Sequence, residues 1–303
     1  MVSDAACNKM MDAALQPVFN LWKNSPLDDS PRGEKQAALM ADTARRMAQT
    51  FTRTMQNSGF RPAYAELRFG AEGPLPPMYL RTTGGQSIAL GGVIDRVDVA
   101  HFEAKQYLRL FDYKSGSWKI DPARLWDGTQ MQLMIYLGAV LNAFPEAEPA
   151  GVFYQKISNP MIQTEDSDRV QDALIKDMQP SGLFISQPEI IHLMDLEHPW
   201  TLGKVFTTKG ELTKSAPAVS AGDLRGLAKH ALHVGQDTAN RIVQGEIQRL
   251  PAMDTARNVP CTYCEYGSIC RLDAQDSPKY RRIGGMKMDE LLRRIHDDSP
   301  SQP

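Results

Sequence analysis

The stretch GVIDRVD, residues 92–98, is followed along the chain by LFDYKSG, residues 110–116. Each is a short apolar run that carries a carboxylate at or near its end, a pattern typical of a β-strand bounded by turns. Asp112 and Lys114 are two residues apart, and because side chains on a strand repeat every two residues, both project from the same face. Together with Asp95, this pattern predicts a site where two carboxylates and a lysine meet.

Such a site has a clear chemical use. Carboxylate oxygens are natural ligands of Mg²⁺, and a neighbouring lysine can stabilise developing charge or position a water for attack on a phosphodiester. The alternative, on these residues alone, is an ordinary β-hairpin with charged surface residues. The rest of the chain has to decide between the two interpretations.

The composition sets broad limits. The chain has 303 residues, of which 42% are hydrophobic and 23% charged, which is enough for one large domain or two small ones. The formal net charge of -2 gives no global sign of a nucleic-acid-binding protein, although a local basic groove is compatible with it. We find no apolar run long enough for a membrane span and no secretory leader pattern, so we expect a cytoplasmic protein without a membrane contact.

Hydrophobic periodicity and Gly/Pro punctuation indicate the order of elements. The pattern predicts a helix at 34–57, strands at 64–69, 78–81, 87–99 and 106–114, a long helix at 123–144 and an apolar strand at 150–157. This order, α-β-β-β-β-α-β, predicts an α/β fold with a mixed sheet flanked by helices.

The chain is expected to divide into a main domain with flanking segments. The expected parts are an N-terminal segment at 1–33, a main domain at 34–275 and a C-terminal tail at 276–303. Within the main domain we expect a polar variable insertion at 158–218 with a few short strands. A capped amphipathic helix at 220–245 follows the insertion.

Three further polar residues are candidates for the site. Gln132 and Tyr136 are four residues apart in the helix that follows Lys114, so they share one face. Since the opposite face of that helix supplies apolar residues for packing, the Gln132 and Tyr136 face is free for a substrate. Glu66 lies inside a strand pattern, where a charge is costly unless it is paired or metal-bound, and is therefore a candidate third carboxylate.

The cysteines form a second candidate site. Cys261, Cys264 and Cys270 follow a C-x2-C-x5-C spacing, which can wrap an iron-sulfur cluster or a zinc ion. Either metal centre needs a fourth ligand, and the remaining cysteine of the chain is Cys7. A link between Cys7 and this cysteine trio would join the two ends of the domain.

Two common catalytic motifs are missing from the sequence. It contains no Gly-x-Ser-x-Gly nucleophile elbow and no Gly-x-x-x-x-Gly-Lys-Ser/Thr phosphate loop. A serine hydrolase and a self-contained ATPase are therefore not expected.

The ordered combination of these motifs resembles the RecB-like branch of the PD-(D/E)XK nucleases, and most closely the C-terminal nuclease domains of AddB subunits of AddAB helicase-nucleases. The resemblance is carried by Glu66, the Gly-x-Ile-Asp turn that ends at Asp95, Asp112-Tyr113-Lys114, the Gln132 and Tyr136 pair, and the cysteine trio before Arg271. It implies a restriction-endonuclease-like fold.

The resemblance also implies roles for these residues. Asp95 and Asp112 would hold Mg²⁺ or Mn²⁺ with help from Glu66, and Lys114 would orient or activate the attacking water. Gln132 and Tyr136 would contact the DNA strand. The cysteine trio would bind a 4Fe-4S cluster, with zinc as the alternative and Cys7 as the candidate fourth ligand.

The implied function is a divalent-metal-dependent DNA exonuclease domain that processes single-stranded ends in double-strand-break repair and recombination, together with an AddA-like helicase-nuclease subunit. Two alternatives stay open: a catalytically inactive DNA-end-binding or scaffold module, and a Cas4-like or Dna2-like nuclease of the same branch. The residues after Cys7 differ from the Pro-aromatic pattern usual in the family, and no histidine precedes His101. We therefore expect the chain to be a fragment that starts just after the first cluster cysteine of a longer protein.

Overall fold

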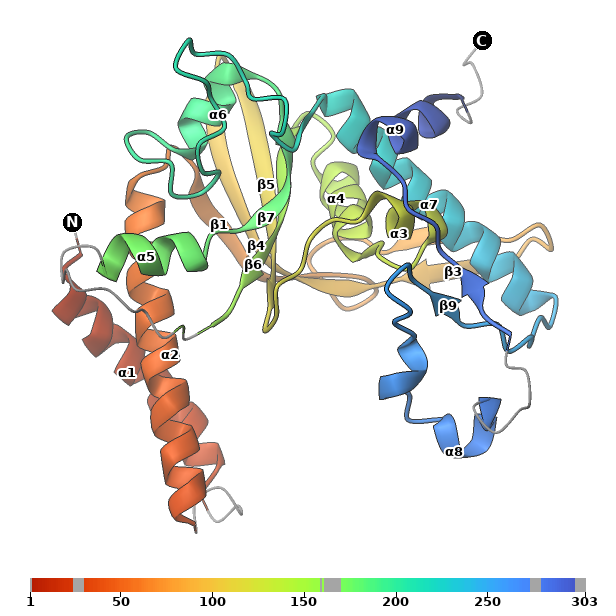
Figure 1. The fold of residues 1–303 in the computed structure, drawn as a ribbon, viewed down its shortest axis with the longest axis horizontal. Coiled ribbons are helices and arrows are strands. Elements are labelled where there is room, and N and C mark those ends of the chain that lie inside the picture. Colours follow the sequence, from red (N-terminus) through yellow and green to blue (C-terminus); the bar gives the residue numbers. More distant parts are fainter. Residues whose placement is uncertain (1, 24–29, 159, 161–169, 273–278, 298–303) are drawn as a thin grey trace.

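A six-stranded mixed sheet forms the centre of the computed structural model, which describes residues 2–23, 30–158, 160, 170–272 and 279–297 (Figure 1). Helices cover both of its faces, as the order of apolar segments predicts. In chain order the elements are α1 Asp4–Leu21, α2 Pro31–Gln56, β1 Arg61–Phe69, β2 Met78–Arg81, β3 Ser87–Leu90, β4 Gly92–Phe102, β5 Lys105–Lys114, α3 Pro122–Asp127, α4 Gln132–Ala143, β6 Glu148–Lys156, α5 Val170–Asp177, β7 Ser181–Ile185, α6 Pro188–Met194, β8 Ala218–Val219, α7 Ala221–Val243, β9 Ala252–Met253, a 3₁₀ turn Pro260–Tyr263, α8 Gly267–Cys270, β10 Arg281–Arg282 and α9 Met288–Asp297.

The strand order in the central sheet is β1-β4-β5-β6-β7-β8. The pairs β5 with β6 and β7 with β8 are parallel, and the other pairs are antiparallel. Because β5 and β6 run parallel, the chain must cross over between them, and α3 and α4 form that crossover. The expected mixed sheet flanked by helices is therefore confirmed.

The two faces of the sheet have different covers. On one face α2 packs over β5, where the ring of Phe51 stacks on that of Tyr113 with centroids 5.7 Å apart. The other face is covered by α4, whose Leu133, Leu137 and Val140 are buried in the core. Since side chains alternate along a strand, successive residues of β5 face α2 and α4 in turn.

The single helix expected at 123–144 is wrong, because the segment forms two helices. Gly128 ends α3 in the left-handed conformation, with φ +82°, and its N–H bonds back to the carbonyl of Leu125. The helix restarts at Gln132. The buried Gln130 side chain fills the gap: its amide nitrogen donates to the carbonyl of Lys119, and its amide oxygen accepts from the N–H of Asp121.

The single strand expected at 87–99 is also interrupted. Its first part, β3, pairs with β2 in a separate two-stranded hairpin, while β4 begins at Gly92 and pairs with β1. A side chain at Gly92 would collide with the ring of Phe69, because a Cβ there would lie 2.8 Å from it. The glycine therefore permits close packing where the chain leaves one sheet for the other.

The segment expected as a variable insertion, 158–218, contributes to the main sheet in its described part. Strand β7 pairs with β6, and β8 pairs with β7. Residues 161–169 lie outside the described residues, as do residues 273–278, where the boundary between main domain and tail is expected. Beyond that boundary, α9 packs on α7, with the ring of His296 2.8 Å from the carboxylate of Asp223.

The helix expected at 220–245 is confirmed as α7. Ser220 caps it through a reciprocal capping box with Asp223, and Gly245 follows it with φ +76°. No helix in the described ranges combines the length and the apolar character that crossing a membrane would need.

We expect Gly128→Ala to destabilise the fold by about 2–4 kcal/mol, because a left-handed alanine is strained and overpacking adds to the cost. The added Cβ would lie 2.5 Å from Val234 of α7. The matched control is Gly245→Ala, which has the same sign of φ but no atom within 4 Å of its Cβ. Urea denaturation should show a smaller loss for the control; equal losses would mean that contact with Val234 adds nothing.

Candidate active site

Two carboxylates face each other where β4 and β5 separate. Arg96 pairs with Phe111 in the antiparallel register, so the next residues outward, Asp95 and Asp112, lie opposite one another on the face covered by α4. The carboxylate of Asp95 accepts a hydrogen bond from the backbone N–H of Tyr113 at 2.5 Å. The structure thus brings these two predicted residues to one place.

Lys114 connects the carboxylates to α4. Its ammonium group lies 2.7 Å from an oxygen of Asp112 and donates to the side-chain oxygen of Gln132 at 2.9 Å. The amide nitrogen of Gln132 in turn donates to the hydroxyl of Tyr136 at 2.9 Å. The four predicted residues therefore form one continuous chain of polar contacts from the sheet to the helix.

The electrostatics of Asp112 follow from its burial. Its residue surface is 1% exposed, and burial raises the pKa of its carboxyl. The Lys114 ammonium opposes this effect, whereas the nearby Asp95 carboxylate raises the pKa of Asp112 further. Burial thus disfavours the charged form of Asp112, and the ammonium of Lys114 favours it.

Tyr154 belongs to the same site, although sequence reasoning missed it. It pairs with Asp112 in the parallel register of β5 and β6, and it is buried beside Trp118, with ring centroids 5.7 Å apart. Burial, with the Asp112 charge as the next cause, raises the pKa of Tyr154 to about 12, so its hydroxyl stays protonated at neutral pH. Only the parallel register between distant strands, which the local sequence does not reveal, could have identified it.

Glu66 is placed on β1 between Ala65, which pairs with Arg96, and Leu67, which pairs with Ile94. It is exposed, and its φ of +51° is unusual for a residue other than glycine. Among the described residues, no group of three Asp, Glu, His or Cys side chains is arranged to hold a metal ion. The backbone of Glu66 thus lies opposite that of Asp95, but the side chains of Glu66, Asp95 and Asp112 do not converge on one metal position.

The chemistry of the remaining donors fits a magnesium ion. Oδ2 of Asp112 is buried, with the Lys114 ammonium beside it but no hydrogen bond of normal geometry. Magnesium keeps several waters and is commonly held by one or two carboxylates together with substrate phosphates. Asp95 and Asp112 are two such carboxylates, so the site does not need Glu66 to bind magnesium.

The cysteine trio lies at the far side of the molecule from α1 (Figure 1). Cys261 on the 3₁₀ turn and Cys264 directly after it are exposed, and Cys270 at the end of α8 is half-buried. Cys7 is instead buried in α1, with its sulfur 3.7 Å from the hydroxyl of Thr52 in α2. The structure does not bring Cys7 to the trio, because the pairing of α1 with α2 keeps its side chain at the other end of the fold.

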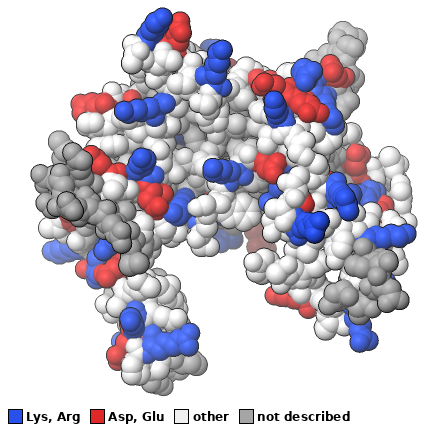
Figure 2. All heavy atoms as spheres, viewed as in Figure 1, with Lys and Arg blue, Asp and Glu red and all other residues white. Residues whose placement is uncertain are grey.

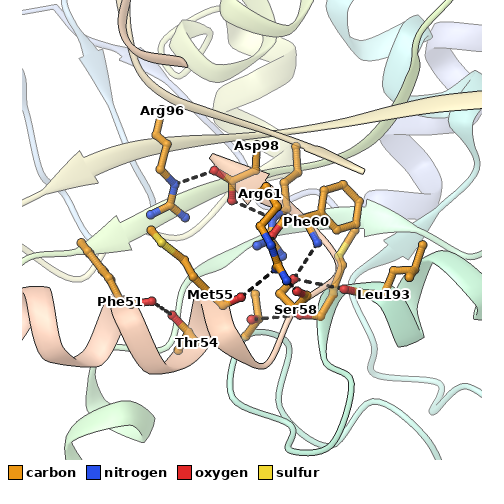
Figure 3. Close-up of polar contacts among 12 residues, drawn as sticks. Phe51, Thr54, Met55, Ser58, Phe60, Arg61, Arg96, Asp98 and Leu193 are labelled. Atoms are coloured by element: carbon orange, nitrogen blue, oxygen red, sulfur yellow. Dashed lines mark hydrogen bonds and ion pairs between the residues drawn. The ribbon is translucent and has the colours of Figure 1, made fainter. Parts of the chain in front are cut away.

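A buried ionic cluster lies on the opposite face of β4 and β5. The carboxylate of Asp98, fully buried, lies 3.0 Å from the guanidinium groups of both Arg96 and Arg109. Figure 3 shows Arg96 and Asp98 of this cluster beside the C-terminal end of α2, with Phe51 and Phe60 labelled nearby. The guanidinium carbon of Arg96 lies 3.8 Å from the centroid of Phe111, and that of Arg109 4.6 Å from the centroid of Phe60.

Tyr113 connects the ionic cluster to the face that carries the two carboxylates. Its hydroxyl accepts a hydrogen bond from Arg96 at 3.1 Å on the α2 side, while its backbone N–H holds Asp95 on the α4 side. The orientation of one carboxylate therefore depends on a residue whose side chain is fixed by the cluster.

Comparison with known proteins shows to which family this sequence is similar. The sequence matches the PD-(D/E)XK nuclease superfamily over residues 2–271. It is 30% identical over 267 residues to the AddB-type subunit of the ATP-dependent helicase/deoxyribonuclease of Alkaliphilus oremlandii, covering 84% of this chain and 23% of that protein. It is 28% identical over 314 residues to the protein of the same description from Desulforudis audaxviator, covering 100% of this chain and 27% of that protein. The chain thus spans about a quarter of the length of these curated relatives.

Asp98→Asn is expected to lower the free energy of unfolding by about 3–5 kcal/mol, because it leaves two buried guanidinium groups without a counter-charge. The matched control is Asp12→Asn, which removes an exposed carboxylate 2.7 Å from Arg45 and should change stability little. Chemical denaturation of both variants tests the difference. A loss for Asp98→Asn as small as that of the control would contradict this account of the cluster.

Proposed function

The chain belongs to the PD-(D/E)XK nuclease superfamily, and we propose that it is a divalent-metal-dependent deoxyribonuclease domain that cleaves single-stranded DNA ends. The observation that carries this proposal is the continuous contact chain from Asp112 through Lys114 and Gln132 to Tyr136. Acidic, cationic and amide groups lie side by side in this chain of contacts, and this combination supports a role in hydrolysis of a phosphodiester.

Each group has a distinct part in the proposed reaction. Asp95 and Asp112 would hold Mg²⁺ or Mn²⁺, which when bound stabilises negative charge on the phosphate. Lys114 has its ammonium fixed between Asp112 and Gln132, where it can stabilise developing charge or orient a water. Gln132 and Tyr136 position Lys114 and present an amide and a hydroxyl to the DNA strand.

The proposed biological setting comes from the relatives, which are named as subunits of an ATP-dependent helicase/deoxyribonuclease. We propose that this domain acts within such a complex in the cytoplasm, in double-strand-break repair and recombination. An AddA-like subunit would unwind the DNA and deliver its single-stranded ends.

The cysteine trio is a second part of the proposal. Three thiols within ten residues suit a 4Fe-4S cluster, with zinc as the alternative. Either centre takes four protein ligands in the usual case, and Cys7 is not beside the trio in this structure. We propose that the trio binds the metal centre in a way that does not depend on Cys7.

We expect Asp112→Asn and Lys114→Met each to lower the rate of Mg²⁺-dependent cleavage of end-labelled single-stranded DNA by roughly 100-fold or more, the usual effect of removing a group that stabilises transition-state charge. The matched control is Asp237→Asn in α7, whose side chain is 60% exposed. Glu66→Gln should retain most of the activity, since Glu66 does not join the carboxylate pair.

Three outcomes would contradict the assignment. Asp112→Asn that cleaves like the parent would exclude this site as the catalytic centre. DNA binding without cleavage by the parent in either metal would indicate the scaffold alternative. Loss of activity in Glu66→Gln as severe as in Asp112→Asn would make Glu66 a metal ligand.

The protein purified without oxygen should absorb broadly in visible light and contain about four iron atoms per chain. Cys261→Ser should lose this absorption, whereas Cys7→Ser should retain it because Cys7 is buried between α1 and α2. A colourless protein with stoichiometric zinc would favour zinc. Equal loss of metal in both variants would identify Cys7 as the fourth ligand and overturn its proposed independence.

A further inference from the structure

One large aromatic side chain at the site has no part in the chemistry described so far. Trp118 follows Lys114 by four residues, on the segment between β5 and α3. Its residue surface is 40% exposed, although it lies against the buried ring of Tyr154. An indole in this position presents a large apolar surface to whatever enters the active site.

The position of this indole is fixed by its surroundings. The ring meets that of Tyr154 at 5.7 Å between centroids and an angle of 48°. The backbone that follows it is anchored by the buried Gln130, which bonds to the carbonyl of Lys119 and the N–H of Asp121, both at 2.8 Å. A platform held in this way loses little conformational freedom when a ligand stacks on it.

The charge around Trp118 favours an anionic ligand. The ammonium nitrogen of Lys114 lies 5.5 Å from the centroid of the indole, and the exposed Lys119 is the next residue along the chain. An aromatic face with flanking cations matches a nucleotide, whose base stacks while its phosphate pairs with the cation. The bases inside a duplex stack on one another, so they are not free to stack on this indole, whereas the bases of a single strand are.

A groove begins next to Trp118, at the residue that follows it in the chain. A cavity of about 970 Å³ begins at Lys119 and Ile120 and runs past β7 to α9. Lys119 and Lys214 are the cations that line it, and Asp223 and Asp289 are its carboxylates, with Asp289 on α9 at the end away from Lys119. Ser181, Ser186, Ser215 and Ser220 also line it, with the hydroxyl of Ser220 bonded to Asp223 at the start of α7. Figure 2 shows positive and negative side chains interspersed over the visible face, so cationic contacts to a nucleic acid there are local rather than spread over one large basic patch.

We propose that Trp118 is a stacking platform that makes the site select single-stranded DNA, by holding an unpaired base next to the Asp112 and Lys114 pair while the flanking backbone enters the groove at Lys119. This inference rests on the proposed nuclease function and adds to it the residue that distinguishes single strands from duplexes. Trp118 is a specificity-determining residue here, because the catalytic groups act without it on any phosphate that reaches them.

The test measures binding without chemistry. Fluorescence anisotropy in EDTA, which prevents metal-dependent cleavage, compares a labelled oligo(dT) with a blunt two-stranded duplex that has no unpaired bases. Trp118→Ala should weaken binding of oligo(dT) about tenfold, the effect of losing one stacked base, and leave duplex affinity unchanged. Trp118→Phe should restore most of the affinity because it restores a ring. The matched control is Trp22→Ala at the end of α1, which should change neither affinity.

A second measurement guards against a folding defect in the alanine variant. If the platform exists, oligo(dT) should quench tryptophan fluorescence in the parent more than in Trp118→Phe. Unchanged oligo(dT) affinity in Trp118→Ala, an equal loss for the duplex, or equal quenching in parent and Trp118→Phe would each overturn the proposal. A parent protein that never cleaves DNA but binds single strands through Trp118 would refute only the nuclease function; a parent that cleaves with Trp118→Ala binding normally would refute only the platform.

Discussion

The register of β4 against β5 is the constraint on which the rest of the structure depends. With Arg96 opposite Phe111 and Asp98 opposite Arg109, the ionic cluster is buried under α2 and the two candidate catalytic carboxylates meet under α4. A slip of one residue would turn every side chain of one strand to the other face. Asp98 would then leave Arg109 on β5, although Arg96 of its own strand would move with it, and Asp95 would leave Asp112. The buried charges make that slip costly and so fix the geometry of the candidate site.

The break at Gly128 sets the second half of the site. Because α4 begins at Gln132, this residue meets Lys114, and Tyr136 one turn later bonds to Gln132. The buried Gln130 holds the preceding segment in place. A helix continuous from α3 would keep one axis through this region, whereas the glycine lets α4 take its own direction. The same turn anchors the segment that carries Trp118. Gly128 and the side-chain amide of Gln130 thus position both Gln132 and Trp118, which lie on different sides of Lys114.

The sequence predicts those parts of the site that depend on local periodicity. A two-residue spacing placed Asp112 and Lys114 together, and a four-residue spacing placed Gln132 with Tyr136. Features that depend on distant pairing were not predictable: β7 extends the sheet, and Tyr154 stands beside Asp112 through a parallel register. The alternation of residue types predicted that Glu66 faces inward. Its left-handed backbone and its exposure could not be predicted from that alternation.

Tyr113 makes contacts on both faces of the sheet. Its peptide N–H holds a carboxylate on one side and its phenol accepts from a buried arginine on the other. A substitution of Tyr113 therefore affects both faces of the sheet. A residue that suits the packing under α2 must also keep the Asp95 carboxylate in place under α4. The proposed reaction in this way restricts which residues can replace buried ones under α2, although these do not contact the substrate.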